Sequence, residues 1–258
     1  MPPKKEPSEI RYLYRFKFDD GTEKDFEVVL NGTTLELKRD DPHPKPEWTK
    51  LKYEQCEKCP LPDSVEYCPV AMSLARLVES FHDAASYESA AVTVETPQRT
   101  YYKKTTLQKG LSAIIGIYMS TSNCPVTDML RPMTRFHLPF ASSLETFFRS
   151  VSSYLTAQFL LMRQGQQPDW EMKNLQEIYK AVNLVNRGMT TRLLRATEKD
   201  ANVNAVVILH SFGDGINYFI ESGLAELEPM FRVFLKNPPA GDPNKTGAGD
   251  SAPSRRPL

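Results

Sequence analysis

The chain has 258 residues, of which 40% are hydrophobic and 25% are charged, as in globular proteins that bury a substantial core. Lysine plus arginine and aspartate plus glutamate both number 32, so net charge gives no attraction to nucleic acid or anionic membranes. The sequence shows no signal peptide and no run of the ~18 apolar residues that a membrane span needs. We therefore expect a cytoplasmic protein without nucleic-acid or membrane partners.

The first regular elements are predicted to be strands, after a flexible tail over residues 1–8. Aromatic side chains alternate with other residues over 12–18, which is typical of a strand. The Asp20-Gly21 pair is a strong hairpin signal, and apolar residues alternate again over 26–30. Two further alternating leucines predict a third strand over 35–37. We expect an antiparallel three-stranded meander with one face on the core.

The middle of the chain is predicted to mix helices with a second hairpin. Apolar positions over 69–81 recur with helical spacing, and Pro69 suits the first turn of that helix. Alternating residues on either side of Pro97-Gln98 indicate the hairpin. A helix carrying apolar residues over 107–118 follows, with the preceding threonine pair as its candidate cap.

Beyond Pro139 the sequence predicts helices alone. Ser142 with Glu145 three positions later forms a capping-box pattern, and Gly165 marks the end of that helix. Two more long helices are predicted to begin at Asp169 and Asp200. A short helix near 224–235 is expected to close the fold.

These elements predict an α+β fold in which a small antiparallel sheet and a cysteine-bearing segment pack against a C-terminal helical bundle. The α+β part is assigned to residues 9–140 and the bundle to residues 141–235. We expect the two parts to form one cooperative unit. Residues 236–258 are rich in proline, glycine and serine and are predicted to be a disordered tail.

Four cysteines form the clearest candidate site. Three lie within "CEKCPLPDSVEYCPV" (residues 56–70) and the fourth lies in "NCPV" (residues 123–126). A C-x2-C pair lets two sulfurs converge from one turn, and two distant cysteines can complete a tetrahedral four-thiolate set. A helix that starts just after Cys68 would favour a thiolate there through its N-terminal dipole. The predicted metal ligands are Cys56, Cys59, Cys68 and Cys124.

Zinc in a closed structural role is the leading interpretation of this set. An iron–sulfur cluster is the alternative, since Cys-Pro steps also occur in cluster-binding runs, although the C-x2-C-x2-C spacing is absent. Unligated thiols packed as small hydrophobic groups are the third possibility. His82 or His137 can replace a sulfur in principle, but a lone histidine near an apolar segment is more often an ordinary packed residue.

Catalytic motifs are missing from the sequence, so no catalytic or cofactor-binding residue is assigned. "HSFGDGIN" (residues 210–217) has the composition of a catalytic turn, but its two glycines are better explained by close contact between helices. Cys124 with His137 lacks a third, orienting group. Four cations of one predicted helix are expected to form a solvated face: Arg187, Arg192, Arg195 and Lys199.

Two function classes remain, and we favour a non-enzymatic interaction or regulatory module that binds a protein partner. Phe147 and Phe148 are adjacent on one predicted helix, as are Leu160 and Leu161, so one member of each pair must face away from the core. Burial in a thick bundle, a homo-oligomer or a partner protein can cover the outward members. The alternative class is a redox or thiol-dependent enzyme that uses the cysteines directly.

Three stretches, "FDDGTEKDFEVVL", "PEWTKLKYEQCEKCPL" and "RPMTRFHLPFA", make the chain similar to a family of uncharacterised bacterial proteins. The resemblance runs from about residue 10 to residue 235 and leaves both tails outside. It implies a bacterial cytoplasmic setting and an α+β core with four cysteines. It implies no activity.

Overall fold

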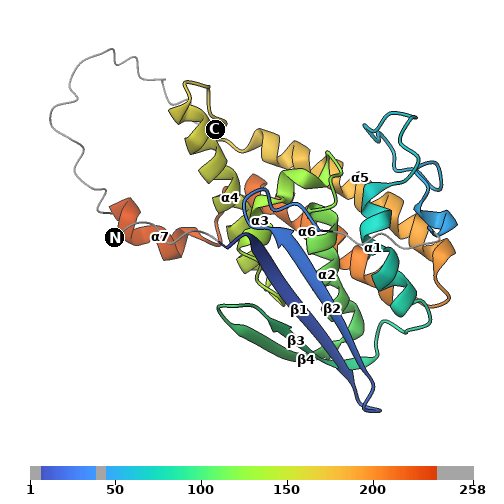
Figure 1. The fold of residues 1–258 in the computed structure, drawn as a ribbon. Coiled ribbons are helices and arrows are strands. Elements are labelled where there is room, and N and C mark those ends of the chain that lie inside the picture. The colour runs from blue at the N-terminus through green and yellow to red at the C-terminus, as the bar shows by residue number, and fades with distance from the viewer. Residues whose placement is uncertain (1–6, 39–44, 237–258) are drawn as a thin grey trace, which may run out of the picture.

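The computed structural model of the protein describes residues 7–38 and 45–236 (Figure 1). The predicted tails, 1–8 and 236–258, lie almost entirely outside these residues. The strands are β1 (Glu9–Phe18), β2 (Glu23–Asn31), β3 (Ser89–Glu95) and β4 (Thr100–Thr106). The helices are α1 (Pro69–Ser80), α2 (Leu107–Ser120), α3 (Pro132–Arg135), α4 (Ser143–Arg163), α5 (Lys173–Ala196), α6 (Ala201–Glu221) and α7 (Glu228–Lys236), with short 3-10 turns η1 (Glu47–Thr49) and η2 (Thr127–Leu130).

The four strands form one antiparallel sheet in the order β2-β1-β3-β4. Both predicted hairpins are present, and the second joins the first through pairing of β3 with β1. Alternation along β1 buries Tyr12, Tyr14 and Phe16 on one face, because successive side chains of a strand point to opposite sides. The α+β prediction is confirmed.

The predicted third strand over residues 35–37 is wrong. Leu37 forms only an isolated bridge to Leu30. The Asn31 side chain accepts hydrogen bonds from the backbone N–H groups of Thr33 and Thr34, at 2.8 and 2.9 Å, and Leu35 has a φ of 60°. After this turn the chain runs briefly beside β2, where the Lys38 N–H donates to the Val29 carbonyl at 2.8 Å, while the Leu37 N–H donates to the Thr121 carbonyl at the end of α2.

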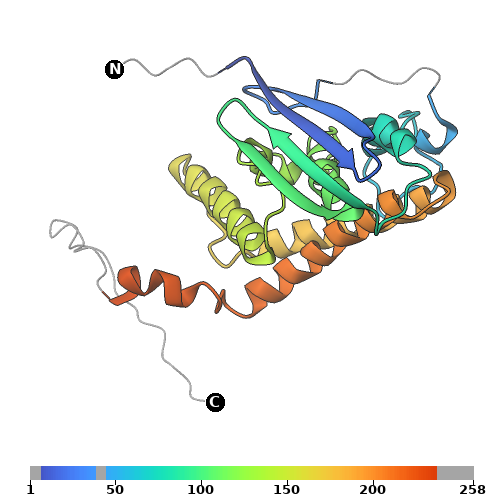
Figure 2. The same ribbon diagram turned by 90° about the horizontal axis from the view of Figure 1, so that it is seen from below.

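The helices stack in two layers on one face of the sheet. Figure 2 shows α1 and α2 lying between the strands and the long pair α5 and α6. Phe16 of β1 and Phe81, at the end of α1, are fully buried with their ring centroids 5.3 Å apart. Among the described residues, no helix is both long enough and apolar enough to cross a membrane.

The predicted start of α4 is confirmed and that of α5 is displaced. Ser142 and Glu145 form a capping box, with side chain and backbone bonded in both directions. Helix α5 begins at Lys173 rather than at Asp169. The Asp169 carboxylate instead accepts the Tyr154 hydroxyl and the Asn174 N–H, at 2.8 and 2.7 Å, so it fixes the turn that precedes the helix.

The C-terminal helix α7 does not close the fold as predicted. None of its residues is buried, and it projects from the body of the molecule (Figure 1). Its sequence does contain apolar residues at helical spacing, but the helix lies beyond the end of α6, and its apolar side chains stay largely exposed.

Two clusters of buried apolar side chains make up the core. One joins the sheet to α1, α2 and parts of α5 and α6, and the other joins α4 to the remaining parts of α5 and α6. On α5, Met189 belongs to the first cluster and Leu175 to the second. The predicted boundary at residue 140 stays a prediction, and two helices shared between the clusters favour one cooperative unit.

Candidate metal centre

The four predicted ligands line one cavity of about 20 Å³. They come from the loop between η1 and α1, from the start of α1, and from the loop between α2 and η2. All four are free cysteines, and Cys124 is only 5% exposed. Segments separated by more than 50 positions therefore meet at this cavity, as the prediction required. The lining includes Cys56, Cys59, Cys68, Cys124, Gly188 and Arg192.

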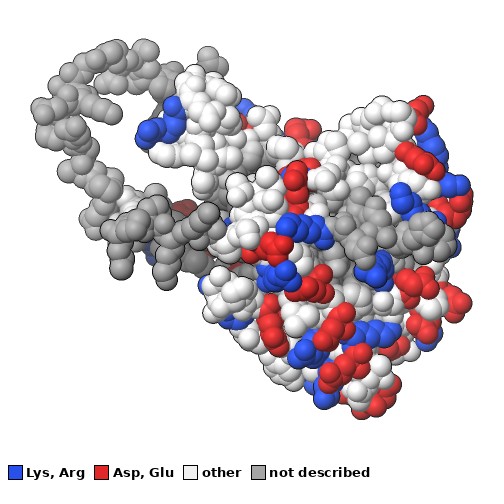
Figure 3. All heavy atoms as spheres, in the orientation of Figure 1, with Lys and Arg blue, Asp and Glu red and all other residues white. Residues whose placement is uncertain are grey.

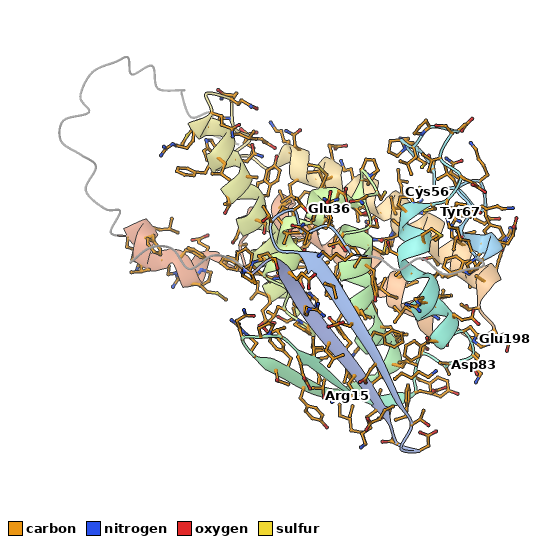
Figure 4. All side chains as sticks on the ribbon, viewed as in Figure 1. Arg15, Glu36, Cys56, Tyr67, Asp83 and Glu198 are labelled. Atoms are coloured by element: carbon orange, nitrogen blue, oxygen red, sulfur yellow. The ribbon has the colours of Figure 1, made fainter. Side chains whose placement is uncertain are left out.

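Backbone hydrogen bonds hold the cysteine loop in place. The Cys59 N–H donates to the Cys56 carbonyl at 3.2 Å, which closes the C-x2-C turn. The Cys68 N–H donates to the Thr49 carbonyl at 2.8 Å, so the end of the loop is tied back to η1. Figure 4 labels Cys56 in the region of the first turn of α1, and Cys68 and Val70 of that turn line the same cavity.

Helix α5 approaches this loop closely at Gly188. A Cβ atom placed on Gly188 would lie 2.5 Å from the Cβ atom of Cys56 and 2.8 Å from its Cα atom. Real Cβ atoms do not approach other atoms so closely, so only glycine lets the loop pack here. This glycine was not singled out by the sequence reasoning, since its role depends on which loop crosses the helix.

Arg192, one helical turn after Gly188, corrects the predicted solvated face. It is 2% exposed, whereas Arg187, Arg195 and Lys199 are exposed as predicted. Its guanidinium donates to three backbone carbonyls in η1 and directly after it: Trp48, Lys50 (2.7 Å) and Leu51 (3.3 Å).

Arg192 is also a buried cation that lines the cavity together with the four cysteines. Burial lowers its pKa, and the nearby Cys68 and Cys56 are the first groups that raise it again. A buried cation is costly unless charge or hydrogen bonds compensate it. The three carbonyls supply hydrogen bonds, and thiolates at this cavity would supply the charge.

Burial at this cavity favours the protonated form of two of the thiols. Burial, and then the neighbouring Cys59 and Cys68, raise the pKa of Cys56 to about 12. Burial also raises the pKa of Cys68, although backbone N–H groups at the start of α1 and the Arg192 cation act in the opposite direction. The expected helix-terminus effect on Cys68 is therefore present but smaller than the effect of burial.

The thiols share the cavity without forming a finished coordination shell. Within residues 7–38 and 45–236, no group of three or more histidine, cysteine, aspartate or glutamate side chains is arranged so that it could hold a metal ion. The two histidines weighed as replacements do not line this cavity. His82 sits partly exposed after α1, and His137 lies 2.5 Å from the Tyr14 hydroxyl through its Nε2 atom.

The alternative catalytic turn at residues 210–217 is part of α6. An added Cβ would lie 2.2 Å from Asn183 Oδ1 at Gly213 and 2.6 Å from Phe147 Cζ at Gly215. The two glycines thus allow close contact with α5 and α4, as the sequence indicated. Cys124 and His137 lie on different cavities and do not form a nucleophile–base pair.

An apolar surface forms a second feature of the molecule. Phe147 is buried, whereas its neighbour Phe148 is 42% exposed and lies 6.3 Å from Phe231 of α7, between ring centroids. Figure 3 shows α4 with few charged side chains, while positive and negative groups are interspersed over β1 and β2. The exposed apolar side chains of this surface are Phe148, Phe159, Leu160 and Met162 on α4 and Met230, Phe231, Val233, Phe234 and Leu235 on α7.

Comparison with curated proteins finds no match, and neither does comparison with solved structures. Comparison with protein families does give a match, over residues 12–232, to a domain of unknown function (DUF6901). The matched segment begins in β1, ends in α7 and contains all four cysteines, so it covers the sheet, the cysteine cavity and the bundle. The chain therefore belongs to the family described as domain of unknown function DUF6901.

Proposed function

We propose that Cys56, Cys59, Cys68 and Cys124 bind one metal ion, zinc in a structural role, and that the protein is a non-enzymatic interaction or regulatory module of the bacterial cytoplasm. The observation that carries the metal proposal is the meeting of four cysteines from separate segments at one small cavity. Their number and type match a four-thiolate zinc site.

Size and charge at the cavity support this proposal. A volume of about 20 Å³ suits a single ion or water molecule and excludes an organic ligand. A zinc ion with four thiolates would carry roughly two net negative charges. Arg192, buried beside the sulfurs, would offset part of that charge. Metal binding would draw the thiols into a closed shell through changes of side-chain rotamer.

The thiol-enzyme alternative has weaker support. A catalytic cysteine needs a lowered pKa and access to substrate. Here burial raises the pKa of both Cys56 and Cys68, and Cys124 is buried. An iron–sulfur cluster uses the same ligand type, so it is the alternative that the experiment must separate from zinc.

Elemental analysis of tag-free protein, purified under reducing conditions without chelator, tests the metal proposal. We expect about one zinc per chain, and a stoichiometry near zero after serine replaces any one of the four cysteines. His82→Ala is the matched control and should leave the zinc content unchanged. A brown colour with visible absorption and bound iron would show that the site holds an iron–sulfur cluster instead of zinc. Wild-type protein without bound metal would contradict the metal proposal.

The interaction proposal is supported by the α4–α7 apolar surface. Monomeric proteins rarely expose large contiguous apolar patches, and such patches commonly mark protein interfaces. We expect Leu160→Ser and Phe234→Ser to abolish capture of a specific partner protein from cell extract, measured by quantitative mass spectrometry. Tyr102→Ser, an exposed position on β4, is the matched control and should retain the partner.

Light scattering on the same samples separates a partner from self-association. A wild-type dimer that becomes a monomer in both Leu160→Ser and Phe234→Ser would mean that a second copy of the chain covers this surface. Identical captured proteins from all variants would contradict the interaction proposal.

A further inference from the structure

A second cavity, of about 660 Å³, lies at the junction of the two core clusters. It is bounded by α2, α5, α6, the beginning of α4 and the segment over residues 127–143, and the cysteines do not line it. The volume falls in the range of small-molecule sites. Its apolar lining includes Ala113, Ile117, Leu130, Phe140, Leu209 and Phe212.

Arg149 of α4 is the half-buried cation of this cavity. Its Nη2 atom donates to the Met133 carbonyl at 3.0 Å, while its buried Nε atom has no hydrogen-bond partner. Within the described parts of the chain, no carboxylate forms an ion pair with it. Glu145, one turn earlier, is engaged with the Ser142 N–H (2.7 Å) and hydroxyl (2.9 Å).

The remaining charged groups make the cavity positive. Lys103 and Lys109 are exposed cations at its lining, and Glu145 is the only carboxylate among the lining residues. Burial and the Arg149 cation lower the pKa of His137 to about 3, so this ring is neutral at physiological pH. A half-buried guanidinium in an apolar cavity is costly without an anionic partner.

We propose that this cavity binds a small amphipathic carboxylate. The carboxylate accepts hydrogen bonds from the Arg149 guanidinium, and the apolar body of the ligand lies against α2 and α6. The planar donor fork of arginine matches a carboxylate, and the apolar walls reward a hydrophobic body. A single half-buried cation favours a monoanion over a phosphate ester, which would need further buried donors.

Calorimetric titration of the full chain with dodecanoate, below its micellar concentration, tests this proposal. We expect saturable binding of one dodecanoate per chain. Dodecyltrimethylammonium has the same tail with the opposite charge, and acetate has the charge without the tail, so neither should bind detectably. Arg149→Met should weaken dodecanoate binding by at least about tenfold. Arg163→Met, at the exposed end of the same helix, is the matched control and should not change it.

A second variant tests the apolar half of the site. A Cβ atom added at Gly116, which lines the cavity, would meet only Leu209 Cδ2 at 3.6 Å, an ordinary contact. We therefore expect Gly116→Leu to fold, to place its side chain in the cavity and to abolish dodecanoate binding. Absence of saturable binding to wild-type protein would overturn the proposal. So would equal binding of the cationic amphiphile, unchanged affinity in folded Arg149→Met, or unchanged affinity in Gly116→Leu if Arg149→Met fails to fold.

Discussion

The two cavities each contain one arginine from a long helix, and the surroundings of these arginines differ. Arg192 is 2% exposed and donates to three backbone carbonyls beside four cysteines. Arg149 is half-buried, donates to one carbonyl, and leaves its Nε atom without a partner. A buried cation that donates to three carbonyls stabilises the protein's own structure, whereas a half-buried one that donates to a single carbonyl beside open volume has Nη donors left for a ligand.

The volumes lead to the same distinction. About 20 Å³ at the cysteines admits an ion, whereas about 660 Å³ at Arg149 admits an organic molecule. The first cavity should therefore govern stability and the second should govern ligand affinity. Each of the following predictions tests that assignment.

Metal removal should have the largest effect on stability. Structural zinc sites in small domains contribute binding free energies of order 10 kcal/mol to folding. We expect a chelator, or Cys59→Ser, to lower the midpoint of thermal unfolding strongly, and added zinc to restore it in the wild-type chain alone. If chelator leaves the midpoint of thermal unfolding unchanged, the stability at this cavity comes from packing and not from a bound metal.

Replacing each arginine in turn compares how much the two cavities contribute to stability. Arg192→Met removes hydrogen bonds to three backbone carbonyls and the cation beside the sulfurs, so we expect a loss of about 3 kcal/mol in the free energy of unfolding. Arg149→Met loses a single hydrogen bond and should cost about 1 kcal/mol or less. Urea denaturation measures both. Equal losses would contradict the distinction between Arg192, with three hydrogen bonds to backbone carbonyls, and Arg149, with one.

A pair of glycines gives a steric version of the same comparison. Gly188→Ala forces its Cβ atom against Cys56, with contacts of 2.5 and 2.8 Å, and should cost about 1–3 kcal/mol and lower the zinc content. Gly116→Ala meets only an ordinary contact at 3.6 Å and should stabilise α2 by about 0.5–1 kcal/mol. Urea denaturation and elemental analysis check both results. Unchanged zinc in Gly188→Ala would show that the close approach of loop and helix is not needed for the site.

The sequence predicted the elements whose signals are local. Period-two alternation gave both hairpins, and the spacing of Ser142 and Glu145 gave the capping box of α4. The third strand failed because the Asn31 side chain and the positive φ of Leu35 form a turn that apolar alternation does not reveal.

The candidate site was predictable in its ligands and not in its surroundings. The cysteine pattern selected four of the residues that line the small cavity. The roles of Gly188 and Arg192 depend on where α5 crosses the cysteine loop. The sequence placed Arg192 on a solvated helix face and gave no signal for Gly188. Arg149 likewise carries no local signal, since its importance comes from a cavity that several separate segments create.

The smallest predicted effect concerns the capping box at the edge of the large cavity. Ser142→Ala removes the acceptor for the Glu145 N–H and should cost about 1 kcal/mol in the free energy of unfolding at neutral pH. Hydrogen bonds from Ser142 hold the pKa of Glu145 below its usual value, so the carboxylate contributes stability above that value and loses it as pH falls through the lowered pKa. The difference in stability between wild type and Ser142→Ala should therefore shrink under acid conditions.

Urea denaturation at neutral and acid pH measures this difference, with Ser143→Ala as the matched control on the next residue. Ser143 is exposed and takes no part in the capping box, so its replacement should leave stability nearly unchanged at both pH values. Zinc content should be the same in both variants, because the box lies at the Arg149 cavity and not at the cysteines. Loss of zinc in Ser142→Ala would instead mean that the two cavities are coupled, and the separation between a stabilising site and a ligand site would fail.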